Sequence, residues 1–308
     1  MKRKILILTE KQPVFHVPQG LEVCFLPHGS RAERLKEMTD TEIVFGEPTA
    51  EELQNAPCLR WVQLSWAGAD RYQNVVFPHA VKLTTASGAF GQTIAEHAMA
   101  MLLSLCRRLP AYDRQCDWLD LGPEKQVSGK TALIFGAGDI GTHIAKLMKA
   151  VDVHTVGVCR KTDAARTYFD ELIPLYAAET RLHRADFVLC ALPHTAETKG
   201  YFDRRRLDLL SDDAVLINVG RGSLIDTQAL CDVLSAGKLF GVGLDVTEPE
   251  PLPPKHPLRQ FPNVIITPHV AGVSFGHLPE TEEQIFRIFT ENLDCYLSGG
   301  PLRNQVMF

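Results

Sequence analysis

Apolar residues in the first third of the chain gather in short runs that are separated by turns and polar segments. The runs predict strands at Ile5–Leu8, Val23–Leu26, Ile43–Phe45, Trp61–Leu64 and Lys82–Thr84. Residues 31–38, 49–55 and 70–74, which lie between them, are predicted as helical or turn-rich. Because strands that alternate with helices are typical of a parallel α/β sheet, we expect one here.

A long apolar stretch follows the first series of strands. Thr93 and Glu96 have the spacing of a capping box, which predicts a helix N-terminus at this point. Residues 98–106 are apolar all round, and such a helix is normally buried on every side, here between two domains or at a subunit interface. Arg107, Arg108 and Pro110 fit its C-terminal end.

A second α/β series occupies the middle of the chain. It predicts strands at Thr131–Phe135, Thr155–Val158, Phe187–Leu192, Ala214–Val219, Gly241–Val246 and Val264–Thr267. A last helix, at about residues 281–297, carries Ile285, Ile288, Phe289, Leu293 and Tyr296 on one face. We expect this helix to return to the N-terminal domain. The predicted domains are therefore residues 1–96 with 274–308, and residues 97–273.

The hexapeptide Gly136–Gly141 follows a predicted strand directly and opens a segment of helical periodicity. Gly136 permits a tight turn, Gly138 lets the backbone approach a diphosphate, and Gly141 lets the helix pack closely on the strand. The helix N-terminus then offers unpaired N–H groups and a partial positive charge to the anion. The pattern predicts a dinucleotide site, with Asp139 and Ile140 among its residues.

The next strand ends in basic residues. A site for NAD usually has an acidic residue about 20 positions after the glycines, which accepts hydrogen bonds from the ribose hydroxyls. Here Arg160, Lys161 and Thr162 occupy that place and fit a 2′-phosphate, so the sequence favours NADP. A solvated basic loop is the alternative, and NAD binding stays open because Asp163 follows closely.

Length, composition and charge are those of an ordinary globular protein. The 308 residues suggest about two domains, and 45% of them are apolar. The net charge of −5 argues against a general nucleic-acid or anionic-membrane surface. The apolar run Ile5–Leu8 is too short for a signal-peptide core or a membrane span. We therefore expect a cytoplasmic protein.

The eight cysteines contain no C-x-x-C pair, and several lie within apolar runs. We interpret them as reduced, buried thiols rather than as a disulfide framework, and a catalytic thiol is the alternative. No Cys/His spacing indicates a zinc site, so no metal is expected.

Polar residues follow three predicted strands at the ends where ligands bind in such sheets. They lie in Leu216–Asp226 with Arg221, in Gly243–Pro253 with Asp245, Glu248 and Glu250, and in Ile266–Gly272 with His269. These segments, in this order after the glycine motif, resemble the D-isomer-specific 2-hydroxyacid dehydrogenases. The match continues in Ser65–Asp70 and Thr93–His97, so it covers most of residues 61–272.

The resemblance implies a fold, a reaction and an oligomeric state. It implies two doubly wound parallel-sheet domains of the α/β class: a flavodoxin-like, discontinuous substrate domain and a Rossmann domain for NAD(P). It also implies an active site between them, hydride transfer between nicotinamide C4 and the carbonyl carbon of a 2-oxo acid, and a homodimer.

The chemistry explains why these residue types are needed. Arg221 is expected to hold the substrate carboxylate bidentately and to polarise the carbonyl, while the N–H groups of Ala67 and Gly68 bind the same carboxylate. His269 is the expected acid in reduction and base in oxidation. Glu250 is expected to orient the imidazole; the family pattern places the acid directly before Pro-Leu, which selects it over Glu248.

The resemblance assigns further residues to the cofactor. Asp245 is expected to contact the nicotinamide amide, and Thr93 to contact the nicotinamide from the interdomain helix. Backbone contacts with the nicotinamide half are expected from Ala191, Leu192, Pro193 and Val219, and the further expected cofactor-binding residues are Gly220, Arg221, His269 and Gly272. His194, Thr195 and Thr198 are expected near the diphosphate or ribose. His97 is interpreted as a structural hydrogen-bonding residue, and Trp66 as either a pocket or a core residue.

The leading hypothesis is an NADPH-dependent reductase of glyoxylate, hydroxypyruvate or a related 2-oxo acid. Two alternatives remain. One is a formate- or phosphite-type dehydrogenase of the same superfamily, although formate dehydrogenases pair the histidine with an amide side chain, where this chain has Glu250. The other is a dinucleotide-sensing corepressor that binds without turnover; the chain shows no long disordered extension or basic tail for such a role.

Overall fold

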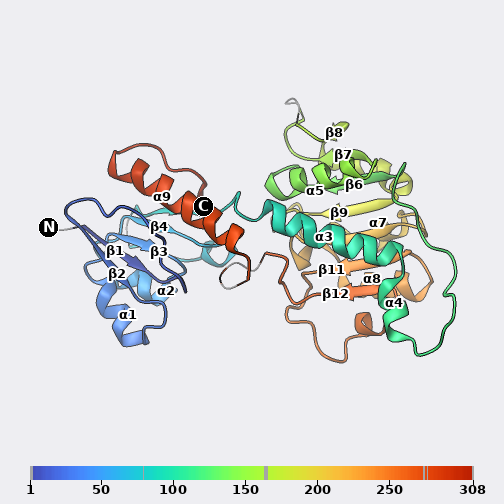
Figure 1. Cartoon of the computed structure of the whole chain (residues 1–308), viewed down its shortest axis with the longest axis horizontal. Coiled ribbons are helices and arrows are strands. Elements are labelled where there is room, and N and C mark those ends of the chain that lie inside the picture. Colours follow the sequence, from blue (N-terminus) through green and yellow to red (C-terminus); the bar gives the residue numbers. More distant parts are fainter. Residues whose placement is uncertain (1–2, 79, 163–165, 273–274, 276, 307–308) are drawn as a thin grey trace. The chain divides into compact units, whose positions relative to one another are not determined.

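The computed structural model describes residues 3–78, 80–162, 166–272, 275 and 277–306. The chain divides into two compact units, which are Met1–Ala89 with Ser274–Phe308, and Phe90–Val273 (Figure 1). This division puts the whole of helix α3 (Gly91–Cys106) in the second unit. Among the described residues, no helix combines the length and the apolar character needed to cross a bilayer.

The first unit is built on a mostly parallel sheet. In the described residues its strand order is β13-β5-β4-β3-β1-β2. The strands are β1 (Arg3–Ile7), β2 (Leu21–Phe25), β3 (Ile43–Phe45), β4 (Trp61–Gln63), β5 (Lys82–Thr84) and β13 (Gln305–Val306). Only β13 is antiparallel to its neighbour. The order of the first five is that of a flavodoxin-like sheet, in which the strand order reverses between β1 and β3.

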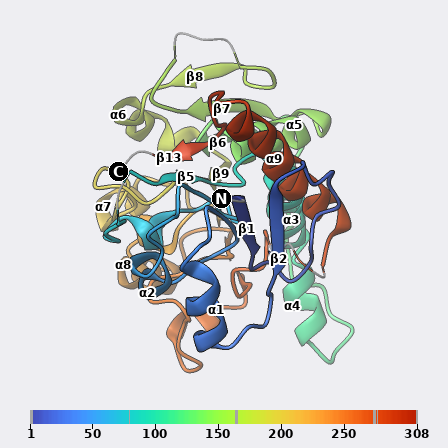
Figure 2. The same ribbon diagram turned by 90° about the vertical axis from the view of Figure 1, so that its left-hand side faces the viewer.

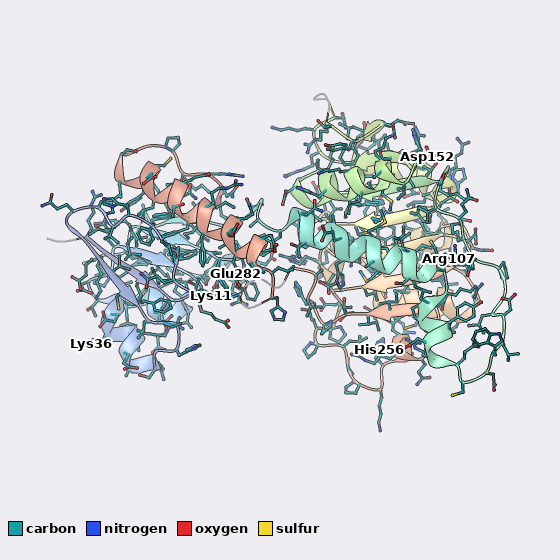
Figure 3. The ribbon with its side chains drawn as sticks, viewed as in Figure 1. Lys11, Lys36, Arg107, Asp152, His256 and Glu282 are labelled. Carbon is teal, nitrogen blue, oxygen red and sulfur yellow. The ribbon has the colours of Figure 1, made fainter. Side chains whose placement is uncertain are left out.

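Helices cover both faces of this sheet. Helix α9 (Pro279–Leu297) lies on one face, and α1 (Arg31–Met38) and α2 (Ala50–Gln54) lie on the other (Figures 1 and 2). The Phe289 ring of α9 stacks on Phe45, with ring centroids 4.2 Å apart. Glu282 of α9 also forms an ion pair with Lys11, with 2.8 Å between Oε2 and Nζ (Figure 3). The helix is therefore held to the sheet by aromatic packing and to the loop after β1 by charge.

The second unit contains a fully parallel sheet. Its order in the described residues is β12-β11-β10-β9-β6-β7-β8, which is doubly wound with the reversal between β6 and β9. The strands are β6 (Thr131–Phe135), β7 (His154–Val158), β8 (Glu171–Ile173), β9 (Phe187–Cys190), β10 (Val215–Asn218), β11 (Gly241–Leu244) and β12 (Val264–Ile266). Ligands of such sheets bind where the order reverses, outside the carboxyl ends of the strands.

The faces of the second sheet are also covered by helices. Helices α3 and α5 (Asp139–Ala150) lie on one face, and α6 (Leu175–Ala178), α7 (Arg204–Asp208) and α8 (Thr227–Ser235) lie on the other (Figures 1 and 2). Helix α4 (Leu109–Arg114) follows α3. Short 3-10 turns occupy Asp70–Tyr72 in the first unit, and Glu179–Arg184, Gly222–Leu224 and Pro257–Gln260 in the second.

The α/β fold class predicted from the sequence is confirmed. Every predicted strand is present, most of them shifted or shortened by one or two residues at an end. The pattern missed β8 and β13. Strand β8 is three residues long and half-buried at a sheet edge, and β13 has only two residues, so neither leaves a periodic signal.

The predicted start of helix α3 is wrong. The helix begins at Gly91 after Phe90, without a side-chain cap, so Thr93 and Glu96 lie inside it and form no capping box. The Glu96 carboxylate instead accepts a hydrogen bond from the Gln92 side chain. The helix is also not buried on every side, because it packs against α5 and β10–β12 and leaves Leu103 39% exposed on its other side.

The cysteines correspond only in part to the predicted buried thiols. All eight are free, but Cys58 and Cys116 are exposed. Cys106, Cys190 and Cys231 are buried, and burial raises the pKa of the Cys190 thiol. No group of three potential metal ligands is found in the part of the chain that the structure describes.

Candidate active site

The glycine turn between β6 and α5 has the shape that a diphosphate requires. Gly136 has a φ of +103°, and a Cβ there would lie 2.8 Å from the carbonyl oxygen of Ala191. A Cβ on Gly141 would collide with the carbonyl oxygen of Gly136. A Cβ on Gly138, in contrast, would meet nothing within 4 Å, so this face of the turn is open. Helix α5 begins there without a side-chain cap, which leaves its first N–H groups available to an anion.

The basic residues predicted to select the dinucleotide lie beside this turn. Gly136 donates its N–H to the Val158 carbonyl at 2.9 Å, so the end of β7 lies next to the glycine turn. Arg160, Lys161 and Thr162, which follow β7, are all exposed. Neither Arg160 nor Lys161 forms an ion pair with another of the described residues. Asp163, the acidic alternative, lies outside the described residues.

Arg166 is a candidate cofactor residue that the sequence analysis missed. Its guanidinium donates a hydrogen bond to the carbonyl oxygen of Ala137, in the middle of the glycine turn. It is therefore a third cation at this turn. The sequence could have indicated Arg166 only through its position, six residues after Arg160.

The loop after β10 holds Arg221 in a defined position. Asn218, the last residue of the strand, is fully buried; it donates from its amide to the Arg221 carbonyl at 2.9 Å and accepts from the Gly220 N–H at 3.1 Å. A Cβ on Gly220 would lie 2.7 Å from the Leu192 carbonyl oxygen, so only glycine fits there. Arg221 itself is half-buried and donates to the Gly220 carbonyl at 2.8 Å. Asn218 is a positioning residue that the sequence analysis did not single out, although it directly precedes the Val-Gly-Arg-Gly segment.

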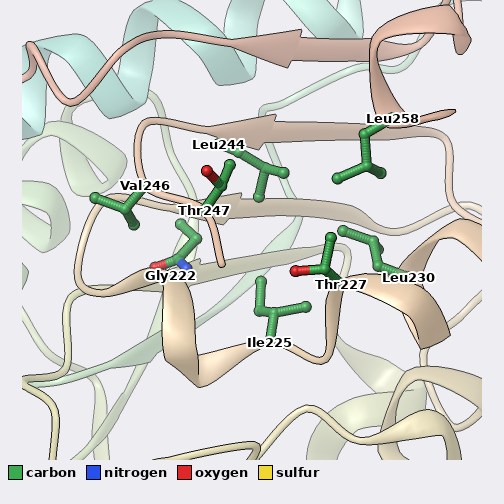
Figure 4. A pocket seen from close by; sticks show the side chains of 9 residues that line it. Gly222, Ile225, Thr227, Leu230, Leu244, Val246, Thr247 and Leu258 are labelled. Carbon is green, nitrogen blue, oxygen red and sulfur yellow. The ribbon is translucent and has the colours of Figure 1, made fainter. Parts of the chain in front are cut away.

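A small pocket lies behind this loop. Its lining is mostly apolar, and the labelled residues come from the loop itself, from α8, from the end of β11 and the residues after it, and, with Leu258, from the 3-10 turn Pro257–Gln260 (Figure 4). Its volume is about 10 Å³, enough for roughly one water molecule. It belongs to the packing that supports the loop and is too small for a substrate.

His269 and Glu250 are brought together by the loops after β12 and β11. Nδ1 of His269 lies 2.7 Å from Oε1 of Glu250, and the two side chains are 46% and 43% exposed. Because Nδ1 is engaged by the carboxylate, Nε2 is the ring nitrogen left for a substrate. The rival acid Glu248 is exposed, and its backbone carbonyl accepts a hydrogen bond from Thr227. The geometry therefore pairs the histidine with Glu250.

The buried carboxylate of Asp245 organises the loop that carries His269. Its Oδ1 accepts from the Thr267 hydroxyl at 2.6 Å and from the Val270 N–H at 2.9 Å, and its Oδ2 accepts from the Ala271 N–H at 3.1 Å. The Asp245 carbonyl accepts the N–H of His269 at 2.8 Å. Asp245 thus fixes the histidine loop, and its predicted contact with the nicotinamide stays a prediction.

Two other histidines support the same region. His97 on α3 lies 3.0 Å from the Thr267 hydroxyl through Nε2, so it extends the Asp245 network to that helix. His194 lies 2.6 Å from the Ser223 hydroxyl, which joins the loop after β9 to the Arg221 loop. Thr198 donates its hydroxyl to the Pro193 carbonyl at 2.7 Å and orders the turn there. Cofactor contacts by Thr93, Leu192, Pro193, Thr198, Val219 and Gly272 stay predictions.

In the first unit, the predicted carboxylate-binding residues follow β4. Ser65 is fully buried, whereas Trp66 is 50% exposed and Ala67 is exposed. The Trp66 carbonyl accepts the N–H of Ala86 at 2.9 Å, which ties the loop to the segment after β5. The guanidinium of Arg71 lies over the Trp66 ring, 5.0 Å from its centroid. Ala67 and Gly68 are thus on an ordered, partly exposed turn.

Comparison with known proteins confirms the resemblance. The model of the D-isomer specific 2-hydroxyacid dehydrogenase NAD binding domain matches residues 99–271. A glyoxylate reductase from Pyrococcus horikoshii is 32% identical over 292 residues, covering 89% of this chain and 84% of that protein.

Solved structures agree with this result. A D-isomer specific 2-hydroxyacid dehydrogenase family protein from Aeromonas salmonicida has a TM-score of 0.87 at 31% identity and covers 100% of this chain and 99% of its own. An NADPH-dependent glyoxylate/hydroxypyruvate reductase from Sinorhizobium meliloti, solved with NADP and sulfate, shares the fold with a TM-score of 0.83 at 24% identity, covering 99% and 98%. The chain therefore belongs to the family of D-isomer-specific 2-hydroxyacid dehydrogenases.

Proposed function

We propose that this dehydrogenase reduces small 2-oxo acids with NADPH, and that glyoxylate and hydroxypyruvate are among its substrates. The observation that carries the proposal is the 2.7 Å contact between His269 and Glu250, in a unit whose strand ends also present Arg221 and the open glycine turn. Relatives named as glyoxylate reductases support the substrate class.

Each polar residue has a distinct part in this reaction. A 2-oxo acid is an anion with an electrophilic carbonyl, and the Arg221 guanidinium binds its carboxylate and polarises its carbonyl. The N–H groups of Ala67 and Gly68 bind the same carboxylate. The bound dinucleotide supplies the hydride that reduces the carbonyl carbon. As negative charge grows on the oxygen, Nε2 of His269 donates the proton.

Glu250 makes His269 suitable for this proton transfer. Its carboxylate accepts a hydrogen bond from Nδ1, which fixes the tautomer and the orientation of the ring. The ring is thereby held so that Nε2 can donate the proton in reduction. In the oxidation direction, Nε2 of His269 accepts the proton of the substrate hydroxyl.

The residues present fit a dinucleotide, and we propose NADP rather than NAD. The glycine turn would hold the diphosphate, because the open face at Gly138 and the uncapped start of α5 admit an anion. Arg160, Lys161 and Arg166 would hold the 2′-phosphate, since all three cations follow β7 and none of them forms an ion pair with a carboxylate of the described residues.

The test of the proposal is an assay of NADPH oxidation with glyoxylate, hydroxypyruvate, pyruvate and phenylpyruvate. Turnover of at least one 2-oxo acid is the expected result, and repeating the assay with NADH is expected to show a higher KM. Tight NADPH binding without turnover of any 2-oxo acid would contradict the proposal and favour a dinucleotide sensor. A strong preference for NADH would overturn the assignment of the basic residues.

We also propose a homodimer in the cytoplasm. Support for the dimer comes from the segment that includes α3 and α4, which exposes Leu103, Leu109, Trp118 and Leu119 in one stretch of chain. Trp118 is fully exposed, and exposed aromatic residues of this size are enriched at protein interfaces. The free cysteines support a reducing compartment.

A further inference from the structure

Glu47 lies beneath the loop that is proposed to bind the substrate carboxylate. Strands β3 and β4 are parallel neighbours, with Phe45 paired to Gln63. Two residues beyond that pair, Glu47 and Ser65 lie side by side at the carboxyl edge of the sheet. Gly46 permits the approach, because it has a φ of +121° and donates its N–H to the Gln63 carbonyl at 2.9 Å.

The Glu47 side chain accepts the hydrogen bonds of Ser65, the residue at the start of the loop. Its Oε1 accepts the backbone N–H of Ser65 at 2.9 Å and the Ser65 hydroxyl at 2.9 Å, and its Oε2 lies 3.0 Å from the same hydroxyl. One partly buried side chain thus binds both the main chain and the hydroxyl of Ser65, which is itself fully buried.

Two later N–H groups of the loop are left for a ligand. In the part of the chain that the structure describes, neither the Ala67 nor the Gly68 N–H has an acceptor. Successive free N–H groups in a turn form a concave site for an anion. Because Glu47 holds the N–H and the hydroxyl of Ser65, two residues before Ala67, it determines how this pair of N–H groups is presented.

We propose that Glu47 is a positioning residue for substrate binding: its carboxyl group fixes the Ser65–Gly68 loop so that the Ala67 and Gly68 N–H groups can bind the carboxylate of a 2-oxo acid. The inference rests on the proposed function, because it needs an anionic substrate at this loop. Glu47 itself touches neither substrate nor cofactor in this arrangement. It acts through the loop.

The surroundings of Glu47 determine which replacement is conservative. Arg71 and Tyr72 face it from the 3-10 helix, Ser65 faces it from the loop, and Arg34 of α1 binds its carbonyl oxygen at 3.4 Å. Burial raises the pKa of Glu47, although the Ser65 hydrogen bonds and the positive charge of Arg71 act in the opposite direction. Since burial disfavours the charged form, the neutral amide of glutamine is a fitting replacement.

The experiment compares Glu47→Ala with Glu47→Gln in steady-state reduction of glyoxylate by NADPH. Glu47→Ala is expected to raise the KM for glyoxylate about tenfold and to change kcat less than about threefold, because it weakens binding equally in the ground and transition states. Glu47→Gln keeps a carbonyl acceptor and is expected to restore the KM to within about threefold of the parent enzyme. The Kd of NADPH should not change in either variant.

A second pair of variants separates positioning from stability. Glu42 lies just before β3, at the opposite end of the same strand, and accepts a hydrogen bond from Tyr296 at 2.7 Å. Glu42→Ala should lower the Tm without changing the KM. Ser65→Ala, which removes the hydroxyl contacts with Glu47, should raise the KM by a smaller factor than Glu47→Ala and provides the test if Glu47→Ala does not fold.

The outcomes distinguish this inference from the proposed function. Turnover by the parent enzyme with unchanged KM in Glu47→Ala, or in Ser65→Ala where the first does not fold, overturns the role of Glu47 and leaves the function standing. An equal rise of KM in Glu42→Ala also overturns it, because the effect would then follow stability. No turnover by the parent enzyme with any 2-oxo acid overturns both.

Discussion

His269 is held in a backbone conformation that a histidine rarely adopts. Its φ is +56°, in the left-handed region, which costs a residue with a Cβ roughly 1–2 kcal/mol. Its N–H donates to the Asp245 carbonyl at 2.8 Å, and the Asp245 carboxylate accepts the N–H groups of Val270 and Ala271, which follow His269. The buried acid therefore offsets the strain and directs the imidazole toward Glu250.

The first prediction concerns this imidazole. His269→Ala should lower kcat for 2-oxo acid reduction about 10²- to 10⁴-fold, because the general acid is lost, while the Kd of NADPH changes little. Stopped-flow reduction and titration of NADPH fluorescence measure the two quantities. His256→Ala is the matched control, since the His256 ring accepts the Leu258 N–H at 3.3 Å and has no part in the proposed reaction. Near-normal kcat in His269→Ala would show that the mechanism is misassigned.

A second prediction at the residue scale concerns cofactor choice. The double variant Arg160→Ala with Lys161→Ala should raise the KM for NADPH by about 10- to 100-fold, because charge-assisted hydrogen bonds to the 2′-phosphate are lost. The KM for NADH should stay the same. Arg107→Ala, which removes an exposed arginine that follows α3 and is paired with Glu124, is the control and should change neither value. Equal effects on NADPH and NADH would contradict the assignment.

At the scale of elements, the turn between β6 and α5 separates two tasks of glycine. Gly141 is needed because its Cβ would collide with the Gly136 carbonyl, whereas Gly138 has open space around its Cβ position. Gly141 therefore serves the packing of the helix, and Gly138 serves the ligand.

The third prediction follows from this contrast. Gly141→Ala should lower the free energy of unfolding by about 1–3 kcal/mol through overpacking. Gly138→Ala should leave the free energy of unfolding nearly unchanged but raise the Kd of NADPH at least about tenfold, because a methyl group then occupies the approach to the diphosphate. Urea unfolding and NADPH titration measure the two effects. Similar losses of stability in both variants would contradict the proposed roles.

The edge of the second sheet is joined to α5 by a carboxylate. Asp170 precedes β8 and accepts from the Thr155 N–H at 2.7 Å, from the Thr155 hydroxyl at 3.1 Å and from Lys149 of α5 at 2.8 Å. Burial alone would raise its pKa, but Lys149 and the Thr155 donors outweigh burial and lower the pKa of Asp170 to about 2. The charged form is thus the one that stabilises this edge.

The fourth prediction is the pH dependence of that contact. A lowered pKa in the folded state stabilises the protein above the pKa of the unfolded chain, about 3.9, and the stabilisation is lost as the pH falls toward 2. Asp170→Asn should therefore cost about 1 kcal/mol of unfolding free energy at pH 7, and the cost should shrink below pH 4. Asp152→Asn, which removes the acid that accepts from Ser128, is the control. A cost that does not change with pH would contradict the prediction.

The elements differ in how far the sequence alone could predict them. The buried strands have clear apolar runs, and the glycine turn has fixed spacing, so both were predicted closely. The start of α3 was not, because Phe90 caps it without any side-chain hydrogen bond. Thr93 and Glu96 offered a stronger local signal that the fold does not use.

The sequence predicted the reactive residues of the candidate site but not the residues that hold them in position. Strand ends indicated Arg221, Glu250 and His269, and family order selected Glu250 over Glu248. Glu47, Asn218 and Arg166 were missed, because their importance depends on a neighbouring strand or turn: Glu47 reaches Ser65 on the adjacent strand, and Arg166 folds back onto Ala137. Such contacts across strands leave no pattern along the chain.

At the scale of the whole molecule, each unit has its own sheet and core. One core cluster joins the helices and strands of the second unit, and another fills the first. In the first unit, the Phe289 ring of α9 stacks on both Phe45 and Trp61. The amphipathic pattern of α9 showed that it has a buried face, but only the family resemblance indicated which sheet it covers.

The fifth prediction concerns assembly. If the exposed apolar residues around α4 form the dimer contact, light scattering should give twice the 34.2 kDa mass of one chain. Trp118→Ser with Leu119→Ser should shift that mass toward the monomer, because exposed aromatic anchors supply much of the energy of an interface. Tyr176→Ser, at another exposed aromatic residue of the same unit, should leave the mass unchanged. A monomeric parent protein would contradict the proposed dimer.

The exposed position of Arg160 and Lys161 has a consequence for how this enzyme can evolve. Substitutions at solvent-facing positions usually alter folding stability by less than about 0.5 kcal/mol. If Arg160 and Lys161 select the dinucleotide as proposed, a lineage could exchange NADP for NAD through a few substitutions after β7 that cost little folding stability. The residues proposed for proton transfer, which follow β11 and β12, would stay unchanged. The preference for NADP or NAD would then change during evolution more readily than the reaction that the enzyme catalyses, and would follow whichever reduced cofactor the cell supplies.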